Sequence, residues 1–204
     1  MDDILLLVVP PAVEPVTLVQ AKVQAHVETA DEDASIGALI TAARAYVEET
    51  TGRALVSQTW GWQHMSWGSL FKGGWSRMSR NAWGSKVIMP RRPLQSVVSI
   101  TYLDVSNTPH TLPATEYVVS PGDPGTIEPS STFSWPEIAA AGYPITITFV
   151  AGYGKVPATL TQAILLLVKD WYDERGAIIT GSRAQVAALP HAVEALLNLY
   201  RWSL

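Results

Sequence analysis

The chain has 204 residues, 48% of them hydrophobic, so it can bury a sizeable core. Its 14 basic and 18 acidic residues give a net charge of −4, which argues against a protein that coats DNA through a basic surface. The absence of cysteine excludes disulfides, thiolate chemistry and cysteine-based zinc sites. The acidic start and the lack of a long apolar run lead us to expect a soluble, non-secreted protein.

The N-terminal part of the chain reads as an extended segment followed by two helices. Residues 1–16 are expected to form an extended N-terminal arm, because three prolines in this segment prevent a regular helix. Thr17 and Gln20 form a capping-box pattern at the start of the first helix. A second helix is predicted to begin at Asp31, in an acidic triplet that suits the positive end of a helix dipole, and to stop at Gly52.

From Leu55 onward the apolar residues recur at every second position, which is typical of strands. Trp60 and Trp62, for example, alternate with smaller or polar residues. We predict an inserted antiparallel β region over residues 55–155, with a long loop at 68–86. The strand candidates are Lys86–Met89, Val97–Leu103, Tyr117–Ser120 and Ile145–Val150, and the turn candidates are 106–110, 120–125 and 140–144.

Helical periodicity returns after Pro157, a favourable residue in the first turn of a helix. One helix is predicted from there to Gly176, and a final helix follows Pro190. The predicted fold class is α+β, with a helical bundle of about four helices interrupted by the antiparallel β insertion. Residues 17–54 and 156–204 form the predicted bundle.

A glycine-rich corner joins the last predicted strand to the helix that follows it. Gly152, Gly154 and Lys155 stand where a phosphate-binding loop places such residues. A Walker loop has a hydroxyl residue after the lysine, whereas Val156 and Pro157 follow here, and proline removes an amide that an anion needs. A tight strand-to-helix corner explains the glycines better than nucleotide binding does.

The sequence shows no catalytic or metal-binding constellation. His26, His64, His110 and His191 lie far apart without metal-site spacing. The acidic triplet Asp31–Asp33 lacks the glycine and glutamate of a calcium loop, and no serine stands in a nucleophile-elbow pattern. We therefore expect no catalytic residue, no metal site and no cofactor.

Residues 68–92 hold six of the 14 basic residues, and no acid occurs between Val56 and Asp104. Residues 1–56, by contrast, carry nine acids and three bases, an asymmetry that suits head-to-tail contact between identical subunits. Two readings of the basic segment stay open: an exposed loop contacting a protein neighbour or nucleic acid, or a hairpin whose tryptophans pack on their own sheet. The candidate inter-subunit or neighbour contacts are Lys72, Trp75, Arg77, Arg80 and Trp83.

Six stretches along the chain carry a resemblance to a known family. They are EPVTLVQAK (14–22), LITAARAYVEETTGRAL (39–55), RRPLQSVVSITYLD (91–104), ITFVAGYG (147–154), PATLTQAILLLVKDWYDERG (157–176) and LPHAVEALLNLYRW (189–202). Together, and in this order, they resemble the head–tail connector, or adaptor, proteins of long-tailed bacteriophages and gene transfer agents. Each stretch is weakly specific alone, and residues 63–86 match no pattern of the family.

The resemblance implies a structural virion protein that is not an enzyme. Such proteins form a ring, usually of twelve copies, beneath the portal protein at the head–tail interface. The ring extends the channel through which DNA passes without specific binding, and it presents a platform to the stopper or tail. The implied protein contacts no membrane and assembles in the host cytoplasm.

The resemblance also implies that the C-terminal helix and tail dock on the portal protein. The candidate portal-binding residues are Leu196, Leu199, Tyr200, Arg201 and Trp202. Alternatively, the last helix only completes its own bundle. Because a DNA channel should not hold phosphates, we expect acids of the helical region to line it.

Three other functions stay open at this point. The chain is alternatively a stopper or tail-completion protein of the same neck, although such proteins tend to be smaller or more purely β. An enzyme acting on cell wall or nucleic acid would need a polar catalytic cluster, which the sequence does not show. A host-side binding module would use Trp60 and Trp62 as a sugar platform, and both side chains would then face solvent.

Overall fold

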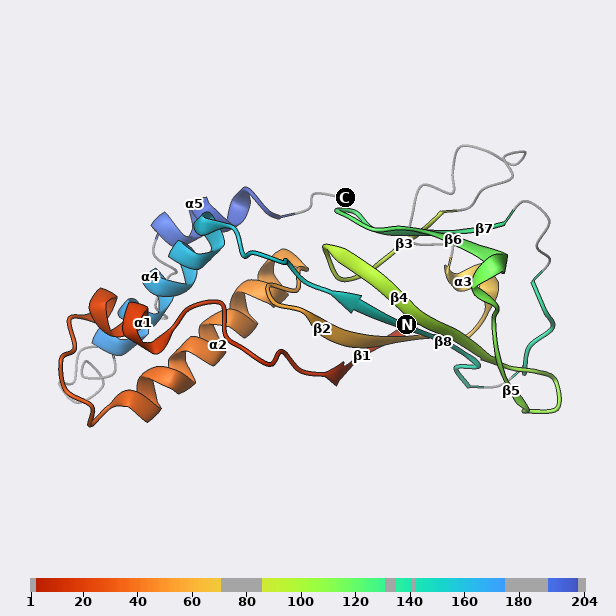
Figure 1. Ribbon diagram of the computed structural model, residues 1–204, viewed down its shortest axis with the longest axis horizontal. Helices are drawn as coiled ribbons and strands as arrows, with labels where there is room; N and C mark the ends of the chain where they lie inside the picture. Colours follow the sequence, from red (N-terminus) through yellow and green to blue (C-terminus); the bar gives the residue numbers. More distant parts are fainter. Residues whose placement is uncertain (1–2, 71–85, 131–134, 141, 175–190, 202–204) are drawn as a thin grey trace, which may run out of the picture. The chain divides into compact units, whose positions relative to one another are not determined.

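The computed structural model describes residues 3–70, 86–130, 135–140, 142–174 and 191–201. Within these residues the chain mixes helices with antiparallel sheets, as the sequence predicts (Figure 1). The chain divides into two compact units. Unit 1 consists of residues 1–11 and 57–152, and unit 2 consists of residues 12–56 and 153–204.

Unit 1 contains a five-stranded sheet with the strand order β1-β2-β8-β4-β5 (Figure 1). Every neighbouring pair in this sheet is antiparallel. A short helix, α3 (Trp67–Leu70), follows the second strand. The strands are β1 (Asp3–Val9), β2 (Gln58–His64), β8 (Ile145–Ala151), β4 (Leu94–Leu103) and β5 (Pro109–Thr111).

Alternating side chains give this sheet one buried face. On β8, Ile147 and Phe149 are buried, whereas the intervening Thr148 is partly exposed. Trp60 pairs with Phe149 and Trp62 pairs with Ile147, so both tryptophans join the buried face. They are only 8% and 7% exposed, and the hypothesis of a tryptophan sugar platform therefore loses its support.

A second, three-stranded antiparallel sheet completes unit 1, with the order β3-β7-β6. Its strands are β3 (Val87–Ile88), β7 (Thr126–Pro129) and β6 (Tyr117–Ser120), and the short 3-10 helix η1 (Ala114–Glu116) precedes β6. A bridge between Leu94 and Gly122 joins this part of the chain to β4. Next to the bridge, a Cβ atom on Gly125 would stand 2.1 Å from the Cβ of Leu94, so the backbones approach too closely for any other residue.

The strand predictions hold where the apolar residues alternate. The candidates at 117–120 and 145–150 coincide with β6 and β8, and those at 86–89 and 97–103 overlap β3 and β4. The turn predicted at 106–110 is partly wrong, since β5 begins at Pro109 and pairs with the end of β4. The sequence reading missed β7, which has only four residues and no clear alternation.

The segment predicted as an extended N-terminal arm contains β1, which pairs with β2 at one edge of the large sheet. Its apolar residues run consecutively from Ile4 to Val9, so no period of two was visible.

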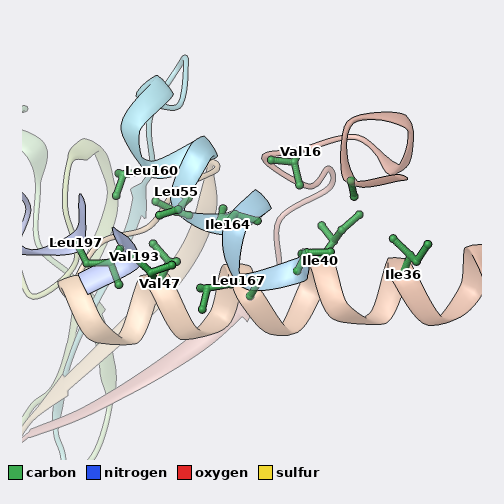
Figure 2. Packing of buried hydrophobic residues seen from close by; sticks show 14 residues of the cluster. Val16, Ile36, Ile40, Val47, Leu55, Leu160, Ile164, Leu167, Val193 and Leu197 are labelled. Carbon is green, nitrogen blue, oxygen red and sulfur yellow. The ribbon is translucent and has the colours of Figure 1, made fainter. Parts of the chain in front are cut away.

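Unit 2 contains four described helices, whose apolar stripes meet in one cluster (Figure 2). Ile40 and Val47 of α2 (Asp33–Thr51) face Leu167 of α4 (Ala158–Glu174), and Val193 and Leu197 of α5 (His191–Asn198) are fully buried among them. The last helix therefore contributes to the core of its own unit. The helices are α1 (Leu18–Ala25), α2 (Asp33–Thr51), α4 (Ala158–Glu174) and α5 (His191–Asn198).

The predicted helix signals form as expected at several ends. Thr17 and Gln20 form both hydrogen bonds of a capping box at the start of α1. Gly52 ends α2 in the left-handed conformation, with φ 66°. The predicted start of α2 at Asp31 is two residues early, because the amide of Asp33 still closes a turn onto Ala30. The predicted helix end at Gly176 lies outside the described residues.

None of the described helices combines the length and the apolar character that crossing a membrane requires.

Candidate contact surface

The described residues bring together no cluster suited to metal chemistry. No group of three or more histidine, aspartate or glutamate side chains among them is placed to hold a metal ion. The histidines lie on separate elements: His64 is buried in β2, for example, and His110 is exposed on β5. The described residues do present exposed side chains suited to contact with another protein.

The glycine corner after β8 is used by the fold itself. The amide of Gly152 donates a hydrogen bond to the carbonyl of Pro93 at 2.9 Å, within unit 1. The amide of Tyr153 donates to the carbonyl of Leu55 at 3.2 Å, within unit 2. Gly152 has φ 142°, a conformation that favours glycine. These two amides are therefore engaged in backbone bonds and are not directed at a phosphate.

The candidate portal-binding residues divide into two groups around α5. Leu196 and Tyr200 are partly buried and pack against the core of unit 2. Leu199, by contrast, is 73% exposed, and Arg201 is also exposed. Trp202 lies outside the described residues. We refer to Leu199 and Arg201 as the C-terminal surface, because these two side chains are the candidates available to a partner.

Tyr200 is held from within unit 2 by Arg53. The guanidinium of Arg53 lies 5.4 Å from the centroid of the Tyr200 ring, and its Nε donates a hydrogen bond to the Tyr200 carbonyl at 3.3 Å. A second nitrogen of Arg53 donates to the hydroxyl of Tyr153 at 2.7 Å. Arg53 thus fixes the end of α5, a role that sequence reasoning missed because the two residues are far apart in the chain.

Arg201 is held only weakly. Its guanidinium lies 4.0 Å from a carboxylate oxygen of Glu194, and the two side chains are 40% and 48% exposed. An ion pair this exposed contributes little stability, so Arg201 can exchange Glu194 for a partner's carboxylate at small cost.

The other candidate contacts, Lys72, Trp75, Arg77, Arg80 and Trp83, lie outside the described residues. The three remaining bases of the 68–92 segment are engaged within unit 1. Lys86 pairs with Glu128 at 2.9 Å, Arg91 is buried with its guanidinium over the Trp60 ring, and Arg92 lies 4.0 Å from Asp123. Three of the six basic side chains of residues 68–92 therefore make contacts within unit 1.

The two units differ less in net charge than residues 1–56 differ from the basic segment at 68–92. Unit 2 carries eleven acidic and eight basic residues, a net charge of −3. Unit 1 carries seven acidic and six basic residues, a net charge of −1. Both units are therefore mildly acidic in net charge, whereas a protein that coats DNA carries a net basic charge.

Two exposed apolar surfaces were not predicted from the sequence. On α1, Val19 and Val23 are 70% and 71% exposed, one helical turn apart. On β1, most of the apolar residues are exposed: Ile4, Leu6, Leu7, Val8 and Val9 range from 36% to 56%. Exposed apolar groups of this kind commonly mark contacts with other proteins.

Comparison with known proteins identifies a structural family that matches this chain. The family model of the head completion protein matches residues 16–203. No curated protein matches the chain. The match to a structural family agrees with the resemblance seen in the sequence motifs, and it confirms that the chain is not an enzyme.

Solved structures of gene transfer agent (GTA) particles share the fold. A chain from the neck of an empty GTA particle, computed with C6 symmetry, has a TM-score of 0.72 and 22% identity, over 97% of this chain and 95% of that one. A chain from the virion of a native GTA particle has a TM-score of 0.71 and 22% identity over the same shares. A chain from the neck of a native GTA particle, computed with C12 symmetry, has a TM-score of 0.68 and 23% identity over 96% and 94%.

Proposed function

Because the chain belongs to the head completion protein family, we propose that it is the structural adaptor in the neck of a tailed particle. It forms a ring beneath the portal protein, extends the DNA channel and joins the head to the stopper or tail. The observation that carries this proposal is fold similarity over nearly the whole chain to proteins of GTA necks. The C12 symmetry of one such neck is the reason to propose twelve copies.

The proposed partners are further copies of this chain, the portal protein and a stopper or tail-side neck protein. The protein resides in the virion at the head–tail interface after assembly in the host cytoplasm. DNA passes through the ring without specific binding, and the mildly acidic charge of both units supports this.

Acids of unit 2 line the channel in this proposal. Exposed carboxylates repel phosphates and so keep DNA from stalling. An assembled ring with a strongly basic lumen would contradict it. The exposed acids among the described residues of unit 2 are Glu28, Asp31, Glu49, Asp173, Glu174 and Glu194, of which Asp173 pairs with Lys169 and Glu194 with Arg201.

The C-terminal surface is the proposed contact with the portal protein. Leu199 supplies an exposed apolar group, and Arg201 supplies a cation whose present partner is weak. Because one face of α5 is buried in the core of unit 2, the contact cannot be tested by deleting the helix. A truncation ending at Leu189 would remove Val193 and Leu197 from the core and would unfold unit 2 along with the contact.

The test therefore uses substitutions on the surface. Full-length protein and the double variant Leu199→Asp/Arg201→Glu are incubated with the cognate portal protein, and complexes are collected by pull-down and imaged by negative stain. Rings on the portal with the natural chain, lost with the double variant, are the expected result. Val118→Asp is the matched control, because Val118 is 57% exposed on β6 and belongs to none of the surfaces assigned to a partner.

The other outcomes are informative as well. Binding that survives the double variant keeps the adaptor role and moves the portal contact to another surface. No binding of the natural chain to the portal protein, together with binding to a tail-side protein, overturns the adaptor proposal in favour of a stopper or tail-completion role.

A further inference from the structure

The edge strand β1 is apolar on both faces and has no neighbour on its outer side among the described residues. Ile4 to Val9 are consecutive apolar residues, a pattern typical of strands that are covered on both faces. Within the chain, however, Leu6, Leu7 and Val8 are 47%, 46% and 56% exposed. The strand contains no lysine or proline to block pairing along its edge.

The opposite side of the same sheet has a short open edge on β4. β5 pairs only with residues 101–103 of this ten-residue strand. The backbone of Leu94 bonds with Gly122, and the carbonyl of Ile100 accepts the amide of Leu112, so both ends of the open span are occupied. Between them no described strand pairs with the outer edge over residues 95–99. Val98, within the span, is 60% exposed.

The strand directions make these two edges complementary. Each pair in the order β1-β2-β8-β4 is antiparallel, so β1 and β4 run in opposite directions. If two copies are related by a small rotation about a ring axis, β1 of one copy meets β4 of the next as an antiparallel neighbour. The strand directions then continue to alternate across the contact from one copy to the next.

Composition agrees with this arrangement. Neither Ile4–Val9 nor residues 95–99 contain a charged side chain, so pairing them buries no unpaired charge. The two register shifts between β4 and β8, at Leu94/Ser96 and Val97/Ser99, lie within the open span, and such bulges commonly limit pairing along an edge. The contact is therefore a short ladder over residues 95–99, not a full-length strand pair.

We propose that β1 of each subunit pairs with residues 95–99 of β4 in the next copy of this chain, forming a sheet that continues around the ring. The inference rests on the proposed function, since a ring of equivalent copies requires two different, complementary surfaces on each subunit. It assigns the inter-subunit contact to unit 1 and to residues outside the basic segment at 68–92.

The absence of cysteine allows a direct test by disulfide trapping. Val98→Cys is combined with Leu7→Cys or Val8→Cys, which sample the two faces of β1. Within one chain β1 and β4 are separated by two strands, or about 14 Å, which is beyond the reach of a disulfide. Any bond between them must therefore join two copies.

The variants are oxidised with and without the portal protein and run on a non-reducing gel, while ring formation is imaged in parallel. We expect a ladder of covalent multimers from at least one double variant. The matched control, Val98→Cys with Val118→Cys, should give none, because Val118 is 57% exposed but lies on β6 of the other sheet. Val8→Cys alone should also give none, since a covalent dimer would reveal β1-to-β1 pairing and overturn the proposal.

The imaging separates the two possible failures. Rings without any cross-link would show that neighbours meet elsewhere, which overturns this inference and leaves the adaptor role intact. Absence of rings under every condition counts against the adaptor role itself. As an independent check, Val98→Lys should abolish rings and keep the circular dichroism of the natural chain, whereas Val118→Lys should leave rings unchanged.

Discussion

At the scale of single residues, one ionic network ties the segment before α1 to α2. The guanidinium of Arg44 donates hydrogen bonds to Glu14 at 2.8 Å and to Glu48 at 2.9 Å. Glu48 is buried, and its other oxygen accepts the amide of Leu55 at 2.8 Å. Burial lowers the pKa of Arg44, but the hydrogen bonds and charges of the two glutamates outweigh it, and the pKa is raised from its ordinary value.

Replacing Arg44 should therefore lower the stability of the folded protein. Arg44→Ala removes the cation that contacts both Glu14 and the buried Glu48, and we expect the free energy of unfolding to fall by about 2–3 kcal/mol. Chemical denaturation followed by circular dichroism measures this. Lys169→Ala is the control, because Lys169 and Asp173 form an exposed pair on α4, and its loss should cost less than about 0.5 kcal/mol. Equal effects of the two substitutions would contradict the network's role.

The turn after β4 gives a prediction about pH. Hydrogen bonds from the Thr108 amide, the His110 side chain and the Ser106 amide hold the pKa of Asp104 below its ordinary value. Because the folded-state pKa is the lower one, this carboxylate stabilises the turn above the unfolded-state pKa of about 3.9, and the contribution is lost as the pH falls through the folded-state value.

An NMR titration should thus place the pKa of Asp104 below that of an ordinary aspartate. In His110→Ala the pKa should move part of the way back, because the two backbone amides remain as donors. A pKa at or above the ordinary value in the natural chain would show that the turn does not form as described.

At the scale of elements, the sequence predicted helix ends that are set by residues close together in the chain. The capping box of Thr17 and the stop at Gly52 involve residues a few positions apart, and both form. The position of Tyr200 depends on Arg53, 147 residues away in the chain, and no local pattern indicates this contact. The start of β5 was missed for another reason, because its three residues are all exposed and show no apolar alternation. The same reasoning proposed Leu196, Leu199, Tyr200 and Arg201 alike as contact candidates, and it could not separate the exposed Leu199 and Arg201 from Leu196 and Tyr200, which pack against the core.

The junction between β4 and the 122–125 turn offers a test at this scale. Gly125→Ala would force a Cβ against the Cβ of Leu94, where no rotamer change can give relief. We expect a loss of about 2–3 kcal/mol in the free energy of unfolding, or failure to fold. Gly154→Ala is the control, because no atom lies within 4 Å of its Cβ position and the change should be nearly neutral. A neutral Gly125→Ala would mean that this junction is not as close as described.

At the scale of the whole molecule, the features converge on a structural part of a larger assembly. The described residues hold no metal cluster, and the chain belongs to a structural family. Its exposed apolar positions include those on β1, on α1 and at Leu199, and exposed apolar groups of this kind commonly mark contacts with other proteins. The proposal assigns β1 and β4 to neighbouring copies and the C-terminal surface to the portal protein, while acids of unit 2 face the DNA.

The central claim is that this protein joins the head to the tail, and removing its gene from the cells that produce the particle tests it most directly. Electron microscopy of the product should show heads and finished tails that remain separate, and full-length protein supplied from a plasmid should restore complete particles. Complete tailed particles in normal numbers without the protein would contradict the account.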